Sequence, residues 1–273
     1  MAEARKVIIT GSSGFLGRRL YDRLKDSYEV FGFDIERGQD IRREEDFRDL
    51  NADYVIHLAA LMRNVREETI LDVNVNGTLN VLNFCRSIGT KLVFASSASV
   101  YGNAKPPVSE DSPLKPDSFY SLTKLFGERL CEFYNRKFSI PTTIVRIFNM
   151  YGPKQQEGLL IPDIIAKLEE EKIVLGNPYP RRDYVYVDDV VDAIARSMEL
   201  DGFNCINVGT GRSYSVKEVA EMLLEISGKR KKIEFSDYLK VDSDSRADIS
   251  RAKRLLGWEP KISLEEGLRR ILS

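Results

Sequence analysis

Tyr120 and Lys124 lie four residues apart, and a serine-rich segment at 96–99 precedes them. Four-residue spacing places two side chains on one face of a helix, and a helix is predicted over 118–138. A free tyrosine has a pKa of about 10, and a neighbouring ammonium group lowers it by favouring the phenolate. Such a tyrosine can exchange a proton with a substrate alcohol. A fall of roughly 3 units needs about 4 kcal/mol, which requires a close, partly dry site.

This spacing alone is also typical of an exposed pair on a helix surface. The prediction of a catalytic pair therefore depends on the neighbouring segments. Ser97 follows a predicted strand at 91–95. In open α/β sheets, ligands bind at the carboxyl ends of the strands. A serine at that edge can hydrogen-bond the reacting oxygen, while the other serines of the segment are expected to cap backbone groups.

A second candidate site is the glycine-rich segment GSSGFLG at 11–17. Gly11 permits a tight turn after a strand, Gly14 lets the backbone approach a pyrophosphate, and Gly17 allows the next helix to pack closely. The helix then begins at Phe15 and Leu16, where backbone N–H groups face phosphate charge. The segment predicts a dinucleotide site, with an ordinary strand-to-helix turn as the alternative.

Residues after the next strand bear on the choice of dinucleotide. Asp34 ends that strand, where a carboxylate can accept hydrogen bonds from adenosine ribose hydroxyls. The same charge would repel the 2′-phosphate of NADP, although Arg37 lies near enough in sequence to bind that phosphate. Asp40 and Ile41 are expected to lie along the adenine. NAD is therefore the expected cofactor, with NADP left open.

Short apolar strands alternate with helical patterns through the first half of the chain. Strands are predicted at 6–10, 29–33, 54–58, 91–95 and 142–147, with helices at 15–25, 67–87 and 118–138. Such alternation favours an α/β fold, a Rossmann-type doubly wound parallel sheet with helices on both faces. Later elements are predicted as helices at 161–171 and 216–227 and strands at 184–187 and 204–208. We expect an NAD-binding domain at 1–152 plus about 181–209, and a smaller, interleaved C-terminal substrate lobe at about 153–180 plus 210–273.

Composition argues against several classes of function. The 273 residues hold 41 Lys and Arg against 42 Asp and Glu, so a broad cationic surface for nucleic acid is not expected. No apolar run approaches the roughly 20 residues that cross a bilayer. The first strand follows MAEARK with no hydrophobic signal segment, so we expect no membrane contact and a cytoplasmic location. Cys85, Cys131 and Cys205 are far apart in apolar stretches, and we expect neither disulfide nor metal site.

Further motifs follow in an order that resembles a known family. They are HLAA at 57–60, NVNGT at 74–78, SSASVYG at 96–102, YSLTK at 120–124, RIFNMYGP at 146–153, RRDYVYVDD at 181–189 and ADISRAKRLLGW at 247–258. With the glycine-rich segment, the set resembles the extended short-chain dehydrogenase/reductases. Among these it resembles the nucleotide-sugar 4-epimerases typified by UDP-glucose (UDP-galactose) 4-epimerase, essentially from end to end.

The resemblance implies roles for individual residues. Ser97 stands at the catalytic Ser/Thr position, Tyr120 at that of the general base, and Lys124 at that of the partner that also holds the nicotinamide ribose. Asn149 and Arg182 match positions that hold the substrate's diphosphate, which suits the planar fork of an arginine. The other implied contacts are Leu58, Ala59, Ala60 and Asn74 for NAD, and Ser99 for the substrate.

The two residues after Ser97 narrow the reaction. The 4,6-dehydratases of this family usually carry an Asp-Glu pair there, and the xylose-forming decarboxylases keep a Glu at the second place. This chain has Ala98 and Ser99. The resemblance thus implies NAD-dependent epimerisation at C4 of a nucleotide-sugar of the UDP-glucose/UDP-galactose type, through a 4-keto intermediate. An NADPH-consuming nucleotide-sugar or carbonyl reductase is the alternative, and a non-catalytic NAD-sensing regulator is a third reading.

Two further expectations concern assembly and the single histidine. The helices at about 67–87 and 118–138 resemble the pair that forms a four-helix dimer interface in this family. Phe126, Leu130 and Phe133 recur at roughly helical spacing, so we expect a homodimer, with packing on the sheet alone as the alternative. His57 is expected to be a structural residue at a strand end.

Overall fold

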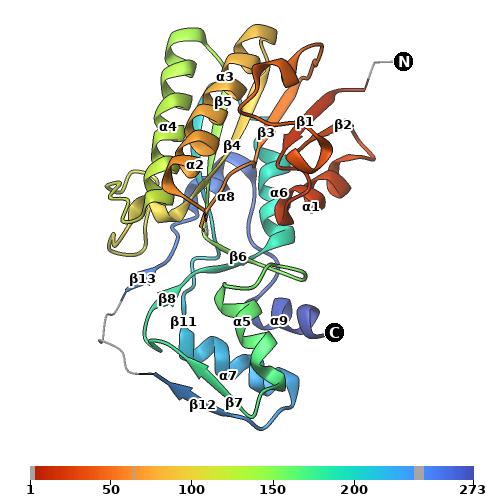
Figure 1. The fold of residues 1–273 in the computed structure, drawn as a ribbon. Helices are drawn as coiled ribbons and strands as arrows, with labels where there is room; N and C mark the ends of the chain where they lie inside the picture. The colour runs from red at the N-terminus through yellow and green to blue at the C-terminus, as the bar shows by residue number, and fades with distance from the viewer. Residues whose placement is uncertain (1–3, 64, 237–242) are drawn as a thin grey trace.

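The structure, a computed structural model, describes residues 4–63, 65–236 and 243–273. Its centre is a six-stranded parallel sheet with the order β10-β5-β4-β3-β1-β2 (Figure 1). The strands are β1 (Lys6–Thr10), β2 (Glu29–Phe33), β3 (Tyr54–His57), β4 (Lys91–Ser97), β5 (Thr142–Ile147) and β10 (Phe203–Val208). The predicted doubly wound α/β sheet is confirmed.

Helices cover both faces of this sheet because its strands are apolar on both sides. In β1, Val7 and Ile9 join the core beneath α1 (Phe15–Leu24) and α6 (Val187–Ser197). Ile8 points the other way and joins the core beneath α3 (Gly77–Ile88) and α4 (Phe119–Phe138). The layers therefore follow from the alternation of side chains along each strand.

The helix predicted at 67–87 is divided. It consists of α2 (Glu67–Leu71), one π-helical segment at Asp72–Asn76, and α3. A π turn closes i→i+5 bonds and is often found at functional sites. Here it contains Asn74, whose side chain is fully used in contacts described below.

The second half of the chain forms smaller sheets and further helices. β6 (Asn149–Tyr151) pairs with β9 (Tyr184–Tyr186), and β7 (Lys172–Leu175) with β12 (Lys232–Phe235). β8 (Arg181–Arg182) lies between β11 (Tyr214–Ser215) and β13 (Asp244–Ser245). The helices are α5 (Leu160–Ala166), α7 (Val216–Ser227), α8 (Ser250–Leu256) and α9 (Leu264–Leu272). Figure 1 shows α5, α7 and α9 grouped with β7 and β12 beyond the end of the main sheet.

One predicted element was wrong in this half. The helix predicted over 161–171 ends at Ala166, and a short 3-10 turn continues to Glu169. β7 follows because Ile173 and Leu175 are buried in alternation and pair with a strand 60 residues later. The division of the chain into two lobes at the stated boundaries stays a prediction.

The strand order sets the place of a ligand site. β1 lies between β2 and β3, so the chain leaves β1 to one side and returns on the other. In open α/β sheets, ligands bind in the crevice at such a switch point. The loops after β1 and β3 meet there. Among the described residues, no helix is both long and apolar enough to cross a bilayer.

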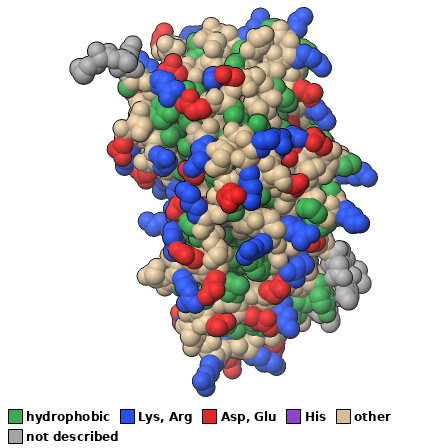
Figure 2. Space-filling model, turned by 180° about the vertical axis from the view of Figure 1, so that it is seen from behind, with side chains coloured by type: hydrophobic (Ala, Val, Ile, Leu, Met, Phe, Trp, Pro, Cys, Tyr) green, Lys and Arg blue, Asp and Glu red, His purple; other side chains and the backbone are tan. Residues whose placement is uncertain are grey.

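The charged surface is mixed in sign. On the face shown in Figure 2, basic and acidic side chains are interspersed, with apolar side chains between them. A protein that binds nucleic acid electrostatically gathers Lys and Arg on one face. This face does not have that pattern.

Candidate active site

The glycine-rich turn between β1 and α1 is closely packed. Gly11 has a φ of 71°, in the left-handed region that favours glycine, and its N–H donates to Phe33 O at 2.9 Å. A Cβ at Gly11 would lie 2.8 Å from Ala59 N, and one at Gly17 would lie 2.1 Å from Gly11 O. Bare backbone and the start of α1 therefore border the crevice, as a pyrophosphate cradle requires.

Asp34 lies beside this cradle. Its Oδ2 accepts from the Ser13 N–H at 2.9 Å and its Oδ1 from the Glu36 N–H at 3.0 Å, so the carboxylate is fixed at the cavity wall. Arg37 packs instead on β2, with its Cζ 3.2 Å from where a Cβ of Gly32 would stand. It lies outside the described lining of the cavity. This geometry suits an adenosine ribose and gives the 2′-phosphate of NADP no partner from Arg37.

Two adjoining cavities, of about 900 and about 820 Å³, follow the carboxyl edge of the sheet. We name the first the glycine-loop cavity and the second the tyrosine cavity. Both are lined by Gly11, Gly14, Phe15, Leu58 and Ala60. The glycine-loop cavity adds the predicted residues Asp34, Asp40, Ile41 and Ala59. The tyrosine cavity adds Leu16, Gly17, Ser97, Tyr120, Lys124, Asn149 and Arg182.

Asn74, which is predicted to contact NAD, is hydrogen-bonded to protein groups. It is buried, its Oδ1 accepts from the Leu61 N–H at 2.8 Å, and its Nδ2 donates to Leu61 O and to Thr123 Oγ1. These bonds occupy the amide, which lies outside the described lining of both cavities. Asn74 therefore holds the loop after β3 against α4.

Ser99, which is predicted to contact substrate, is hydrogen-bonded to Ser97. Its hydroxyl donates to Ser97 Oγ at 2.9 Å, and its N–H approaches the same oxygen at 3.2 Å. Ser99 lies outside the described lining of the tyrosine cavity, whereas Ser97 is part of it. The short 3-10 turn at Ala98–Tyr101 folds Ser99 back onto Ser97. Ser99 thus orients the residue expected to contact substrate.

Ser97, Tyr120 and Lys124 come together at the end of β4. Ser118 caps α4 in a reciprocal capping box with Ser121, which fixes the first turn of the helix where Tyr120 stands. Lys124 is 5% exposed, its Nζ donates to Ala95 O at 2.8 Å, and it lies 5.9 Å from the centre of the Tyr120 ring. Lys124 is thus buried behind Tyr120, whose side chain is partly exposed at the cavity.

Burial dominates the ionisation of this pair. It raises the pKa of Tyr120 to about 12, against a hydrogen bond with Ser97 that lowers it. Burial lowers the pKa of Lys124 to about 8, opposed by Cys131 and Glu128. The sequence-based expectation of a tyrosine pKa lowered by the lysine is therefore not met by the chain alone. A further positive charge in the cavity is needed to favour the phenolate.

His57 is structural, as predicted. Its Nδ1 lies 2.7 Å from Thr10 Oγ1 and its Nε2 2.9 Å from Thr78 Oγ1, so both ring nitrogens are hydrogen-bonded. Burial, with the nearby charge of Lys124, lowers the pKa of His57 to about 3. The imidazole is neutral and joins β1, β3 and α3.

Asn149 and Arg182 approach the tyrosine cavity from the small sheets. The Asn149 N–H donates to Asp183 O at 3.0 Å, which places β6 beside β9. Arg182 Nη1 donates to Arg181 O at 2.8 Å and to Ser243 Oγ at 2.9 Å. One edge of the guanidinium is thereby fixed while Arg182 still lines the cavity. A planar, fixed guanidinium can engage two phosphate oxygens at once.

Part of the lining was not predicted. Arg63 donates from Nη1 to Gly158 O at 2.5 Å and so joins the loop after β3 to the loop before α5 across the cavity. The other unpredicted lining residues include Met62, Gln155, Gln156, Leu159, Leu160, Pro180, Tyr184 and Val216. They come from loops and small strands whose meeting depends on the tertiary fold, and the sequence carries no local signal for it.

Fold and site together define a dinucleotide-dependent enzyme with a tyrosine and a lysine beside the cofactor cradle. The comparison with known families is more specific. Residues 7–209 match the model described as the NAD dependent epimerase/dehydratase family, so the chain belongs to this family and its cofactor is NAD. The fixed Asp34 and the side-chain-free cradle at Gly11 and Gly17 fit that cofactor.

Named relatives and solved structures agree with the family. A UDP-glucuronate 4-epimerase of Thermodesulfobacterium geofontis is 33% identical, over 97% of this chain and 94% of the relative. The crystal structure of UDP-glucose 4-epimerase with UDP-glucose from Thermotoga maritima has a TM-score of 0.91 and 32% identity, covering 98% of this chain and 97% of that one. UDP-glucuronic acid 4-epimerase from Bacillus cereus in complex with NAD has a TM-score of 0.88 and 29% identity, with coverages of 98% and 97%.

Proposed function

We propose that the chain is an NAD-dependent nucleotide-sugar 4-epimerase acting on a substrate of the UDP-glucose/UDP-galactose type. One observation carries this assignment. Ser97, Tyr120 and Lys124 share a single cavity with Asn149 and Arg182, and that cavity adjoins the glycine-loop cavity. A proton-transfer group, a cofactor cradle and a candidate diphosphate anchor thus lie along one edge of the sheet.

The proton chemistry belongs to the residues at the end of β4. When bound, NAD supplies the acceptor and donor of hydride. Tyr120 takes the proton of the C4 hydroxyl and later returns it, and the Ser97 hydroxyl hydrogen-bonds the same sugar oxygen. Lys124 supplies positive charge to the phenolate from the next turn of α4.

A diphosphate anchor in the same cavity would allow both faces of C4 to be presented to the reacting groups. Asn149 and Arg182 would hold the diphosphate by hydrogen bonds and charge. The hexose is then the free end of a molecule held by its phosphates, and its 4-keto form can turn over in the cavity. This arrangement needs no second proton donor on the opposite wall, because Tyr120 returns the proton to the same oxygen.

The acidic groups of the cavity support epimerisation over dehydration. Elimination of water needs an acid placed to protonate the leaving hydroxyl. Ala98 and Ser99 occupy the turn after Ser97, and among the described residues that line the tyrosine cavity the one carboxylate is Glu157. Glu157 is exposed and lies on the loop before α5, not on the turn after Ser97.

The test is a panel of substrates with the full chain. We expect C4 inversion, followed by NMR, with UDP-glucose or UDP-galactose and without net change in added cofactor. Tyr120→Phe should lose about 10²–10⁴-fold in turnover while keeping bound NAD. Inversion of UDP-glucuronate alone, or of a dTDP- or GDP-sugar alone, would refute the assigned substrate. Stoichiometric NADPH consumption would indicate the reductase, and an inactive protein that binds NAD would indicate the regulator.

We also propose a homodimer through α2, α3 and α4. Leu71, Phe126 and Phe133 are 39%, 43% and 46% exposed on these helices. Exposed large apolar side chains often mark interfaces when they form a patch. Phe133→Glu should shift the mass measured by light scattering from dimer to monomer. Phe203→Glu, at a comparably exposed phenylalanine on the edge strand β10, should leave it unchanged; a monomeric wild type would refute the dimer.

A further inference from the structure

Glu128 is a buried carboxylate one helical turn beyond Lys124 on α4, and it is 3% exposed. It forms a two-pronged ion pair with Arg146 of β5, with Nε to Oε1 at 2.9 Å and Nη2 to Oε2 at 2.7 Å. Ser96 Oγ donates to Oε1 at 2.5 Å. A buried ion pair is often no more stabilising than apolar residues of the same volume. Its place in the structure is therefore more informative than its contribution to stability.

That place is the contact between the two elements that carry the reacting groups. Three consecutive residues of β4 meet three residues spaced four apart on one face of α4. The contacts are Lys124 Nζ with Ala95 O, Glu128 with Ser96 Oγ, and Tyr120 with Ser97. The first and last involve the catalytic residues. In the middle one, Ser96 lines the tyrosine cavity, whereas Glu128 lies outside its described lining. Glu128 thus fixes the helix on the strand beside the reacting groups.

We propose that Glu128 is a positioning residue for the epimerisation. With Ser96 and Arg146 it fixes α4 on β4 so that the Tyr120 and Ser97 hydroxyls share one substrate oxygen. The proposal rests on the proposed function, because it assigns the residue that holds the groups of that reaction in place. Glu128 acts through its neighbours and does not itself contact substrate.

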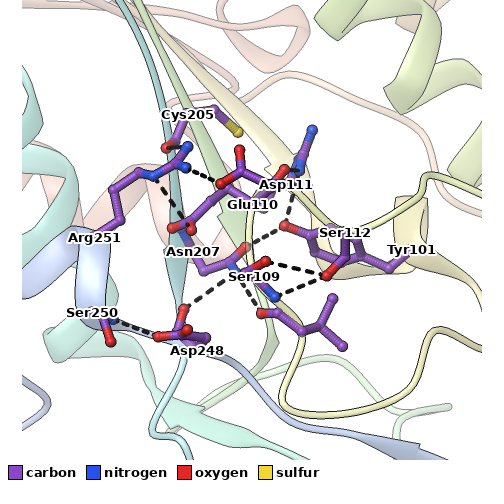
Figure 3. Close-up of polar contacts among 12 residues, drawn as sticks. Tyr101, Ser109, Glu110, Asp111, Ser112, Cys205, Asn207, Asp248, Ser250 and Arg251 are labelled. Atoms are coloured by element: carbon purple, nitrogen blue, oxygen red, sulfur yellow. Dashed lines mark hydrogen bonds and ion pairs between the residues drawn. The ribbon is translucent and has the colours of Figure 1, made fainter.

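Arg146 is also hydrogen-bonded on the side away from Glu128, and these bonds fix its position and therefore that of Glu128. Arg146 Nη1 donates to Tyr101 OH at 2.9 Å and to Glu110 O at 3.0 Å. Tyr101 OH donates to Asn207 Oδ1 at 2.7 Å, and the Asn207 N–H donates to Glu110 Oε1 at 2.8 Å. Figure 3 shows Glu110, Asn207 and Tyr101 in this network, with Arg251 at its outer edge. The hydrogen-bond network of Glu128 and Arg146 therefore extends from β4 and α4 to Asn207 on β10.

The charge of Glu128 also reaches the catalytic lysine. The carboxylate raises the pKa of Lys124 against the effect of burial. The other titratable groups near Lys124 are Tyr120, the neutral His57 and the thiol of Cys131, whose pKa burial raises. Arg146 carries a positive charge, but it is paired with Glu128. Removing the carboxylate should therefore lower the pKa of Lys124 and leave it less charged at neutral pH.

The decisive variant is Glu128→Gln in the full chain with bound NAD, because the amide keeps the shape and removes the charge. We expect kcat to fall at least about tenfold while KM changes less than about twofold. The alkaline limb of the kcat–pH profile should move to lower pH, by at least about half a unit. The rate of the first half-reaction, read as absorbance of reduced cofactor at 340 nm, should fall in parallel with kcat. Ser96→Ala removes only the strand-side bond and should show a smaller fall in kcat, with the pH profile unchanged.

Asp189→Asn is the matched control. Asp189 is a buried carboxylate whose oxygens accept from the N–H groups of Lys261 and Ile262, away from β4, so its loss should lower stability and leave kcat and the pH profile unchanged. Wild-type kcat and pH profile in Glu128→Gln would overturn the proposal. A loss of stability without a change in kcat, as expected for Asp189→Asn, would also overturn it. If Glu128→Gln does not fold, a wild-type kcat in Ser96→Ala overturns it. Absence of epimerisation by the wild-type protein would instead refute the proposed function.

Discussion

Replacing Gly11 with alanine tests the cofactor cradle most directly. The variant must keep a φ of 71° with a side chain, which costs about 1–2 kcal/mol. Its Cβ would also lie 2.8 Å from Ala59 N and 2.9 Å from Ala59 Cα, both backbone atoms. The two segments must separate by about 0.6 Å to reach an ordinary contact of 3.4 Å. Asn74 holds the segment after β3 through Leu61, so this separation cannot be absorbed freely.

The separation opens the wall shared by both cavities, so the variant should lose cofactor affinity as well as stability. We expect at least a tenfold weaker NAD affinity, which corresponds to about 1.4 kcal/mol. Gly89→Ala is the control, because Gly89 has a φ of 69° at the end of α3 and nothing within 4 Å of a Cβ. Both variants should lose the backbone cost in urea unfolding, and Gly11→Ala should lose more because of its contact with Ala59. Equal NAD affinity in the two variants, measured by titration calorimetry, would refute the close contact between the loops.

Two further predictions concern buried polar residues. The pKa of His57 is lowered to about 3 in the folded chain, whereas a histidine in the unfolded chain has a pKa of about 6.5. Between these two values the unfolded chain binds a proton at this residue and the folded chain does not. The stability that this group contributes is present above pH 6.5, and the free energy of unfolding should fall by up to about 1.4 kcal/mol per pH unit below it. In His57→Gln, the free energy of unfolding measured with urea should fall less steeply between pH 6.5 and 5 than in the wild type. An unchanged slope would contradict the neutral, buried imidazole. Asp183 is fully buried, accepts from the N–H groups of Thr210, Gly211 and Ala247, and immediately follows Arg182. Asp183→Asn should raise the KM for nucleotide-sugar at least about tenfold with unchanged NAD affinity in calorimetry, whereas a parallel loss of NAD would show that the residue stabilises the whole fold.

Some main strands could be predicted with exact ends, because strands that are buried on both faces consist mostly of apolar residues. The strands at Lys6–Thr10 and Thr142–Ile147 are buried along nearly their whole length. Glu29–Phe33 was also predicted to the residue, although it lies at the edge of the sheet and only its last two residues are buried. The strand at Lys172–Leu175 was missed because its partner is far along the chain and the run before it has helical periodicity. The π segment at Asp72–Asn76 likewise has no signal in local propensity.

Within the site, motif position predicted which residues gather at the cavity but not how each is used. Asn74 stands in a motif of NAD-binding segments, yet its amide is consumed by Leu61 and Thr123. Ser99 stands beside the substrate position, yet its hydroxyl donates to Ser97. These outcomes depend on hydrogen-bond partners that come from other elements. A local pattern can place a side chain at an edge, but the competition for its polar atoms is decided by the fold.

The same competition governs the catalytic tyrosine. The chain's own groups set the pKa of Tyr120 at about 12, because burial outweighs the hydrogen bond with Ser97. Burial also lowers the pKa of Lys124, so the two residues alone do not keep Tyr120 deprotonated at neutral pH. Oxidised NAD, if bound with its nicotinamide ring beside Tyr120, would supply a positive charge that lowers the pKa of the phenol. Proton removal from the substrate is thereby favoured when the cofactor is in the form that can accept hydride. The two events would depend on each other, because a charge in a cavity between protein walls is screened less than in water.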